Sequence, residues 1–205
     1  MFRSLIATFL IALGLTGCAT TRLVDSDVRS YATPPSVPVG AHYRFERLPS
    51  QQANAAQQAR LEAMAQQALA KVGLQRDDAS ASYSVQVSVG VKVDPYSPGD
   101  GPYDGGWPGW NFGFGLHSGH MMIGGSHLMH GFPGFGVPDR PYYWRQVSLI
   151  IRSVSTHQVV YETQAAHDGP WSDSDTILSA MFDAALKDFP TPPQGVRRVN
   201  IEIPR

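Results

Sequence analysis

The most regular pattern in the chain is an alternation of apolar and polar residues over Tyr83–Val93. Every second position there is tyrosine or valine, and the positions between are serine, glutamine, glycine and lysine. Successive side chains of a strand point to opposite faces of a sheet, so this segment predicts a half-buried strand. Similar alternations predict three further strands, the first two forming a hairpin around residues 155–158. They cover Tyr143–Ile151, Val159–Ala165 and Val199–Ile203.

Two weaker strand patterns lie nearer the N-terminus. His42–Leu48 alternates modestly, with two aromatic residues on one face, and predicts a strand. Leu23–Tyr31 predicts a short strand. The residues between these two segments include Pro34, Pro35 and Pro38, which favour an extended connector over a helix.

A first helix is predicted from apolar residues that recur at helical spacing over Leu61–Val72. Ser50 or Asn54 can provide its N-cap, and Gly73 is placed to end it. The helix is amphipathic, and its apolar face is thin and rich in alanine.

A second helix is predicted to begin at Ser172–Asp175, where serine and aspartate offer caps and first-turn acids, and to end at Phe189 before Pro190. The order of elements is then β-α-β-β-β-α-β, with short connections. This order predicts an α+β fold with a single, mostly antiparallel sheet and two helices packed on one face.

Residues 94–141 differ in composition from the rest of the chain. They hold 13 of the 20 glycines and 7 of the 16 prolines, with eight aromatic and five charged residues. Because glycine loses the most backbone entropy on ordering, we expect a long, mobile Gly-rich insertion loop. Its aromatic residues either pack on the bare face of the sheet or form an interaction surface. They include Trp107, Trp110, Phe112, Phe114, Phe132 and Phe135.

Composition and charge exclude several classes of protein. The 16 Lys and Arg residues against 17 Asp and Glu residues give a formal net charge of −1, so the chain lacks the basic excess of a nucleic-acid-binding protein. A hydrophobic fraction of 42% is sufficient for a globular core. Since the chain has one cysteine, it can form neither an internal disulfide nor a cysteine-built zinc site.

The position of that cysteine indicates a lipid anchor. One positive charge in Met1–Ser4 precedes the apolar run Leu5–Leu15, which has the length of a signal-peptide core and is too short to span a membrane, where about 20 residues are needed. The run ends in Leu15-Thr16-Gly17-Cys18, which resembles the lipobox of bacterial lipoproteins. We therefore expect residues 1–17 to be a signal peptide and Cys18 to carry a diacylglycerol.

Such an anchor holds a protein on a membrane without spanning it. Ala19 follows the cysteine where an inner-membrane retention signal would have an aspartate. Similarity to sorted lipoproteins thus favours the outer membrane, facing the periplasm, over the inner membrane. The expected organisation is a signal peptide at residues 1–17, a lipidated N-terminus and linker with a short strand at 18–41, and an α+β domain at 42–205.

Several of these motifs occur together in one known family. They are the lipobox, a YRFER strand followed by Leu48-Pro49, an Ala/Gln-rich helix ending in Val72-Gly73-Leu74, the valine strand, the Gly/aromatic insertion, the strand Trp144–Ile151 and a helix ending in Phe189-Pro190. Over Leu23–Arg205 the chain resembles the bacterial lipoproteins of the domain of unknown function 4136 family. The stretch Ser153–Tyr161 departs from the hairpin of that family. The resemblance implies an envelope lipoprotein and supplies no reaction, substrate or catalytic residue.

A histidine cluster in the insertion is the main candidate for metal chemistry. His117, His120, His127 and His130 form two His-x-x-His pairs with methionines between them. Neutral imidazoles bind zinc, copper or nickel, and thioethers favour Cu(I). Against a metal site, no Asp or Glu lies between the first and last histidine to orient a ring. Two alternatives to a metal site remain. The histidines either reflect composition drift in a low-complexity loop or gain positive charge in mildly acidic surroundings and so sense pH.

No catalytic constellation stands out. Neither Ser118 nor Ser126 lies in a Gly-x-Ser-x-Gly elbow, and Asp173 and Asp175 are typical of the start of a helix. We therefore expect a non-enzymatic cell-envelope lipoprotein that presents its domain to an envelope protein or glycan and uses no cofactor. The alternative is a periplasmic metal-binding lipoprotein that uses the four histidines. Nothing in the sequence indicates the oligomeric state.

Overall fold

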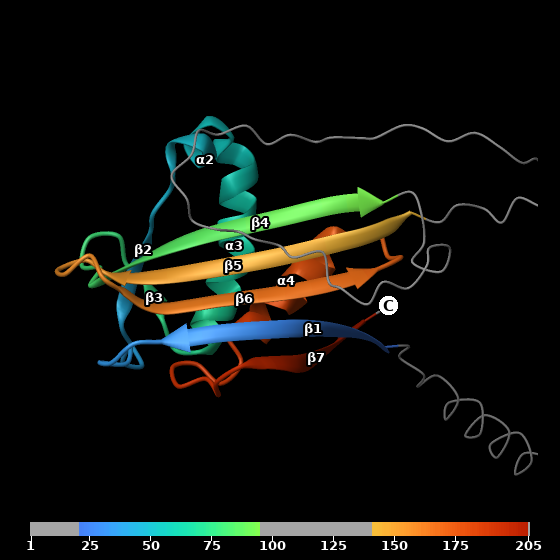
Figure 1. Cartoon of the computed structure of the whole chain (residues 1–205). Coiled ribbons are helices and arrows are strands. Elements are labelled where there is room, and N and C mark those ends of the chain that lie inside the picture. Colours follow the sequence, from blue (N-terminus) through green and yellow to red (C-terminus); the bar gives the residue numbers. More distant parts are fainter. Residues whose placement is uncertain (1–20, 95–140, 205) are drawn as a thin grey trace, which may run out of the picture.

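In residues 21–94 and 141–204, seven strands form one mixed sheet and helices cover one of its faces (Figure 1). The computed structural model describes these residues, and the expected insertion loop lies outside them apart from its two ends. The predicted α+β class is confirmed. The elements are β1 (Thr21–Ala32), β2 (His42–Phe45), α2 (Pro49–Ala53), α3 (Ala55–Lys71), β3 (Gln75–Arg76), β4 (Tyr83–Asp94), β5 (Tyr142–Ser153), β6 (Val159–Gly169), α4 (Ser174–Ala185) and β7 (Val196–Pro204).

The strands lie in the order β3-β2-β4-β5-β6-β1-β7. The pairs β4–β5, β5–β6, β6–β1 and β1–β7 are antiparallel, as predicted for most of the sheet. However, β2 runs parallel to both β3 and β4. The sheet is mixed because α3 is a crossover that returns the chain to the end where β2 began, and a strand that follows such a helix pairs in parallel.

The predicted order β-α-β-β-β-α-β does not count two strands of the structure, β1, which was predicted as a short strand over Leu23–Tyr31, and β3. β1 has 12 residues and pairs on both sides, with β6 and with the edge strand β7. Its apolar pattern is weak because Ser26 and Ser30 take buried positions alongside Val24 and Val28. β3 has only two residues, Gln75–Arg76, too few to show a period.

The prediction of two helices is wrong in number, because the structure has three in the described part of the chain. The third is the short helix α2, which Asn54 separates from α3 with a non-helical ψ of 46°. The side chain of Gln51 accepts a hydrogen bond from the Leu48 N–H at 2.9 Å and so caps the start of α2. Asn54 is the N-cap residue of α3, one of the two positions expected for it.

Both long helices lie on the same face of the sheet, as predicted (Figure 1). Gly73 ends α3 as expected, with a φ of +86° that favours glycine. A Cβ there would lie 2.8 Å from Cγ1 of Val39. α4 ends at Ala185, earlier than predicted, and the chain then turns through Asp188, whose φ is +66°.

The core lies between this helical layer and the sheet. Its largest fully buried side chains include Tyr43 of β2, Tyr161 of β6, Phe182 of α4, Leu69 of α3 and Leu149 of β5. On β4 the residues that face the helices alternate strictly with serine, glutamine, glycine and lysine, and on β5 and β6 they alternate with mostly polar residues, Trp144, Ile150 and Ala166 being exceptions. This alternation is the pattern that the sequence showed most clearly.

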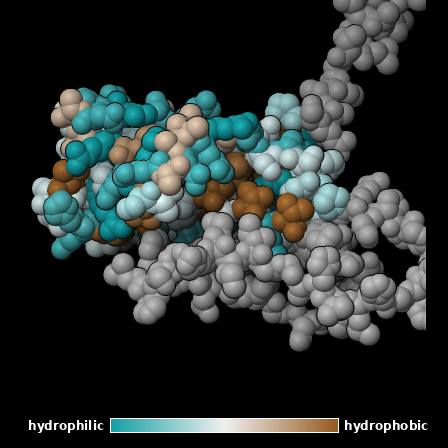
Figure 2. Space-filling view, turned by 90° about the horizontal axis from the view of Figure 1, so that it is seen from above, coloured by the Kyte–Doolittle hydropathy of each residue, from teal (hydrophilic) through white to brown (hydrophobic). Residues whose placement is uncertain are grey.

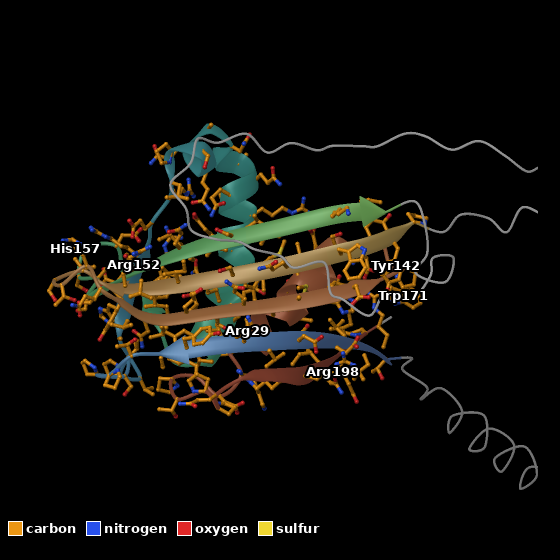
Figure 3. All side chains as sticks on the ribbon, in the orientation of Figure 1. Arg29, Tyr142, Arg152, His157, Trp171 and Arg198 are labelled. Carbon is orange, nitrogen blue, oxygen red and sulfur yellow. The ribbon has the colours of Figure 1, made fainter. Side chains whose placement is uncertain are left out.

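The two ends of the sheet are formed by different strand ends and connections. At one end, β1 begins at Thr21, β4 ends, β5 begins at Tyr142, and β6 and β7 end; we call it the insertion end. At the other end the β5–β6 connection turns through His157, with a φ of +59°; we call it the hairpin end. Tyr142 and Trp171 mark the insertion end in Figure 3, and Arg152 and His157 mark the hairpin end.

Candidate functional site

The site residues predicted from the sequence lie outside the described part of the chain. These are the lipidation candidate Cys18 and the metal candidates His117, His120, His127 and His130. Within residues 21–94 and 141–204, no three His, Cys, Asp or Glu side chains are grouped to hold a metal. In the same residues, no helix has both the length and the apolar character to cross a bilayer. The histidine cluster stays a prediction, which elemental analysis of the protein and of its four-alanine variant tests.

Segments far apart in the sequence meet at the insertion end. Thr21, which begins β1, is the register partner of Pro204 in β7. Asp94, which ends β4, is the register partner of Tyr142, which begins β5. Thr21, which is three residues after Cys18, therefore lies at the same end of the sheet as Asp94 and Tyr142, the strand ends nearest residues 95–140 (Figure 1).

Aromatic side chains gather at this end. The rings of Tyr142 and Trp144 meet edge to face with centroids 5.6 Å apart. The Tyr142 hydroxyl donates a hydrogen bond to Asp168. Burial, followed by this bond to a carboxylate, raises the pKa of Tyr142 well above its usual range. Trp171 lies in the connection from β6 to α4 and is 43% exposed.

Behind these aromatics, on the helix-covered face, lies a group of buried polar residues. We call it the basic cluster, and it consists of Arg22, Ser26, Arg145 and His167. Arg145 and His167 are cross-strand partners on β5 and β6 and are 2% and 6% exposed. Arg22 and Ser26 face the same side from β1, and Ser26 is fully buried.

Arg145 is held against the first turn of α4 by neutral groups. Its Nε and Nη2 donate hydrogen bonds to Ser174 Oγ at 3.2 and 3.1 Å, and Nη2 also donates to the carbonyl oxygen of Trp171. Its guanidinium carbon lies 4.8 Å from the ring centroid of Tyr143. Burial, followed by the nearby Arg22, lowers the pKa of Arg145. The described residues give this guanidinium no carboxylate partner.

The other two basic residues of the cluster have partial partners. Arg22 pairs with the carboxylate of Asp173, and its guanidinium carbon lies 5.2 Å from the ring centroid of Trp171. His167 Nδ1 lies 2.6 Å from the carbonyl oxygen of Asp25, which can only accept, so Nδ1 carries the proton. The Asp25 carboxylate is 3.6 Å from the same nitrogen and half exposed.

A second buried charged group lies between α3 and β4, and there every charge is matched. We call it the paired cluster, and it consists of Arg47, Gln58 and Glu62. Arg47 donates from Nε and Nη2 to the two oxygens of Glu62 at 2.7 and 2.6 Å. Gln58 Nε2 donates to Glu62 Oε1 at 3.3 Å and to the carbonyl oxygen of Val87 at 3.2 Å. These bonds dock α3 on the sheet.

The hairpin end carries an open pocket of about 400 Å³. It is lined by Arg44, Phe45, Glu46, Ser84, Val154 and His157. The Ser84 hydroxyl donates a hydrogen bond to Glu46 Oε2 at 2.8 Å. Arg44 and Glu46 therefore give this solvent-facing pocket one positive and one negative group.

Part of β4 is a free edge of the sheet. In the described residues β2 pairs with β4 only over Tyr83–Val85, so the remainder of that edge has no neighbouring strand. Val91 and Val93, near the insertion end, are 47% and 53% exposed. Figure 2, which looks down on this edge, shows hydrophobic residues gathered along it. Exposed apolar side chains on an unpaired edge are typical of interaction sites.

The basic cluster was not predicted from the sequence, although two of its residues carry a signal there. Arg145 has the same strand parity as the core residues Val147 and Leu149, and His167 has the parity of Ala165. A charged residue at an inward position of an otherwise regular strand is expected to be buried. Such a position deserves to be treated as a candidate site residue.

A model of the family described as "Domain of unknown function (DUF4136)" matches residues 24–191. The chain belongs to the DUF4136 family. The match spans β1 to the turn after α4, so it includes the basic cluster apart from Arg22. Membership confirms the resemblance seen in the sequence, and it carries no assigned activity. A comparison with curated proteins finds no match.

Three solved structures were found to be similar to this chain. The DUF4136 chain is similar to the crystal structure of a PDZ domain protein from Parabacteroides distasonis, with a TM-score of 0.51 and 14% identity. The similarity covers 94% of this chain and 41% of that one. Two dodecamer structures of PelC from Paraburkholderia phytofirmans match with a TM-score of 0.39 and 12% identity, over 78% of this chain and 94% of theirs. At these identities the first likeness is one of fold alone.

Proposed function

We propose that this DUF4136 protein is a non-enzymatic lipoprotein of the bacterial cell envelope. Residues 1–17 are its signal peptide, and Cys18 carries the lipid that holds it on the outer membrane, facing the periplasm. With a lipid anchor the domain needs no membrane-spanning segment and remains at the membrane surface. The apolar run Leu5–Leu15 and the Leu15-Thr16-Gly17-Cys18 motif support the anchor.

The place where β1 begins is the observation that carries this proposal. Thr21 is three residues beyond Cys18, and three residues span at most about 11 Å. The insertion end is thus held close to the membrane surface. Tyr142, Trp144 and Trp171 lie at that end, in keeping with the preference of tyrosine and tryptophan for the membrane–water interface.

The domain presents this end to an envelope partner, a protein or a glycan, next to the membrane. Both ends of the insertion lead there, and the free edge of β4 brings Val91 and Val93 to the same region. A strand with unpaired backbone groups and exposed valines can accept a strand of another protein. The partner surface therefore comprises the β4 edge and the insertion.

Membrane fractionation of Cys18→Ser tests the anchor. The wild-type protein should partition into the detergent phase and sediment with the outer membrane. The variant, which lacks the acceptor sulfur, should be lost from both. Unchanged partition of Cys18→Ser contradicts the proposal. Ser155→Ala, at an exposed position of the hairpin end, is the control for a mutation that leaves the anchor intact.

Photo-crosslinking in cells tests the partner surface. A photoreactive residue at Val91, Trp107 or Phe132 should give a defined adduct, to be identified by mass spectrometry. The matched control is Thr156, an exposed residue of the hairpin end, which should give none. Adducts from Thr156 alone, or from no position in a correctly localised protein, contradict this part of the proposal.

A further inference from the structure

Unsatisfied polar atoms concentrate at one place in this fold. Seven buried side-chain nitrogen or oxygen atoms of the described residues have no hydrogen-bond partner, and four of them belong to the basic cluster. They are Arg22 Nε, Ser26 Oγ, Arg145 Nη1 and His167 Nε2. The great majority of buried polar groups in folded proteins are bonded, so a cluster of exceptions indicates a missing partner.

The excess of charge specifies the nature of that partner. Arg22 and Arg145 carry two positive charges, and Asp173 is the carboxylate that contacts one of them. A guanidinium stays protonated in proteins, and a buried charge without a counter-ion is costly. Among the described residues, the two guanidiniums of the basic cluster are therefore short of one negative charge, since the Asp25 carboxylate lies by His167 and contacts neither of them.

The first turn of α4 adds to this preference. Its N-cap residue Asp173 makes no side-chain hydrogen bond to the helix, because its carboxylate is engaged by Arg22. The uncapped N–H groups and the helix dipole favour an anion at this position. The guanidinium of Arg145 lies against the same turn through Ser174 Oγ.

We propose that the basic cluster and the N-terminus of α4 form a binding site for a phosphate group. Arg145 Nη1 and Arg22 Nε donate to its oxygens, since a guanidinium fork matches the geometry of phosphate. Ser26 Oγ is a further donor. His167 Nε2, which has a lone pair when Nδ1 carries the proton, accepts a hydrogen bond from a hydroxyl of the ligand, either on the phosphate or on the alcohol of a headgroup.

The connection Pro170–Asp173 is the route by which the anion enters. Ser172 and Asp173 are exposed and lie over the cluster. The Asp173 carboxylate already forms an ion pair with Arg22. A bound phosphate competes with this carboxylate for Arg22. Removal of the negative charge of Asp173 should therefore strengthen binding.

The phosphate can belong to a lipid headgroup or be free in solution. The insertion end that holds the site is also the end at which β1 begins, three residues beyond Cys18. A lipid headgroup at the membrane surface would thus be within reach. The site itself depends only on the described residues, so it stands whether or not Cys18 is lipidated.

Thermal unfolding of the full-length protein in a neutral detergent tests the site. Inorganic phosphate is titrated against potassium chloride of equal ionic strength. We expect the unfolding midpoint to rise with the logarithm of phosphate concentration, as for any ligand that binds the folded state alone. The second arm compares nanodiscs of phosphatidylcholine with nanodiscs that also contain phosphatidylglycerol. A rise in the first arm identifies free phosphate as a ligand, and a rise in the second arm alone identifies the headgroup.

Matched variants assign any effect to this site. Arg145→Met removes the buried fork, and Arg145→Lys keeps the charge without the fork. We expect the apparent affinity to fall about 10-fold or more in both. Arg197→Met is the control, because Arg197 is another inward-facing arginine, in the distant half of β7, and its Nε lies 3.6 Å from the carboxylate of Asp188. No rise in either arm for the wild type, or an equal rise in Arg145→Met, overturns the proposal.

Discussion

The paired cluster and the basic cluster both place charge beneath the helices, and they differ in how that charge is balanced. In the paired cluster, Glu62 has a 4% exposed side chain and accepts two hydrogen bonds from Arg47. In the basic cluster, Arg145 is equally buried and bonds only to a hydroxyl, a carbonyl and an aromatic ring. Within residues 21–94 and 141–204, the charges of the paired cluster are balanced, whereas the Arg145 guanidinium has no carboxylate partner.

This difference separates structural from functional burial of charge. A buried ion pair with its lone pairs satisfied holds two elements in register, and the loss of one partner leaves an uncompensated charge. A buried cation without a counter-ion costs stability in the empty protein and is compensated when an anion binds. Removal of the arginine should therefore lower the unfolding midpoint strongly in the paired cluster, and it should leave the midpoint almost unchanged in the basic cluster when no anion is bound.

Arg47→Met should have the largest effect, because it leaves the Glu62 carboxylate buried with Gln58 as its remaining partner. We expect the midpoint of thermal unfolding to fall by about 10 °C at neutral pH. Differential scanning calorimetry measures it. The double variant Arg47→Met/Glu62→Leu removes both charges and should recover most of the loss. A double variant as unstable as the single one would show that packing, rather than charge, holds α3 on β4.

Asp173→Asn should have an intermediate effect, because it removes the carboxylate partner of Arg22, whose side chain is 10% exposed. The pair is half exposed on the Asp173 side, so we expect a fall of about 4 °C in chloride buffer. Phosphate should then stabilise this variant more than the wild type, since the competing carboxylate is gone. Equal stabilisation of the two proteins by phosphate would show that the Asp173 carboxylate does not compete with phosphate for Arg22.

The layout of the fold could be predicted where the sequence alternates regularly. The strands β4, β5, β6 and β7 and both long helices were found, because valine alternation and helical spacing report directly on a half-buried element. β1 was underestimated because Ser26 and Ser30 occupy core positions, where Ser30 Oγ meets Thr163 Oγ1 at 2.8 Å. The parallel pairing of β2 could not be predicted from local pattern, since it depends on the crossover through α3.

The candidate site was less predictable than the fold. Cys18 and the histidine cluster were found from motifs, but the basic cluster draws on β1, β5, β6 and the start of α4, which only the tertiary fold brings together. A count of charges shows no basic excess, because Arg145 and Arg22 are offset by acids elsewhere. Their charge matters locally, where burial weakens the screening by water.

Tyr43→Phe distinguishes an uncharged unpartnered group from the charged ones. The Tyr43 hydroxyl is buried without a partner, and burial raises the pKa of Tyr43 to about 12. Loss of this hydroxyl should be neutral or raise the unfolding midpoint by about 2 °C at pH 7.

The same substitution should change the pH dependence of stability. Because the folded pKa of Tyr43 exceeds the ordinary value of 10.0, the wild type should lose stability as pH rises from 10 to 12, and the variant should lose less. Urea unfolding across this range measures both, with Tyr31→Phe, at an exposed tyrosine, as the control for loss of a hydroxyl. Parallel pH profiles for wild type and Tyr43→Phe would contradict the assignment.

Arg145→Met should have the smallest effect in phosphate-free buffer, although Arg145 is among the most buried charged residues described. The substitution removes three hydrogen bonds to neutral groups, and it also removes the cost of an uncompensated buried charge. Replacement of buried charge by an apolar side chain of similar length is often neutral, so we expect the unfolding midpoint to stay within about 2 °C of wild type. A fall as large as that of Arg47→Met would mean that Arg145 is part of the structural framework and that its unpartnered Nη1 has no ligand to bind. An unchanged midpoint, together with the loss of stabilisation by phosphate, would show that the chain carries this charge for a partner outside itself.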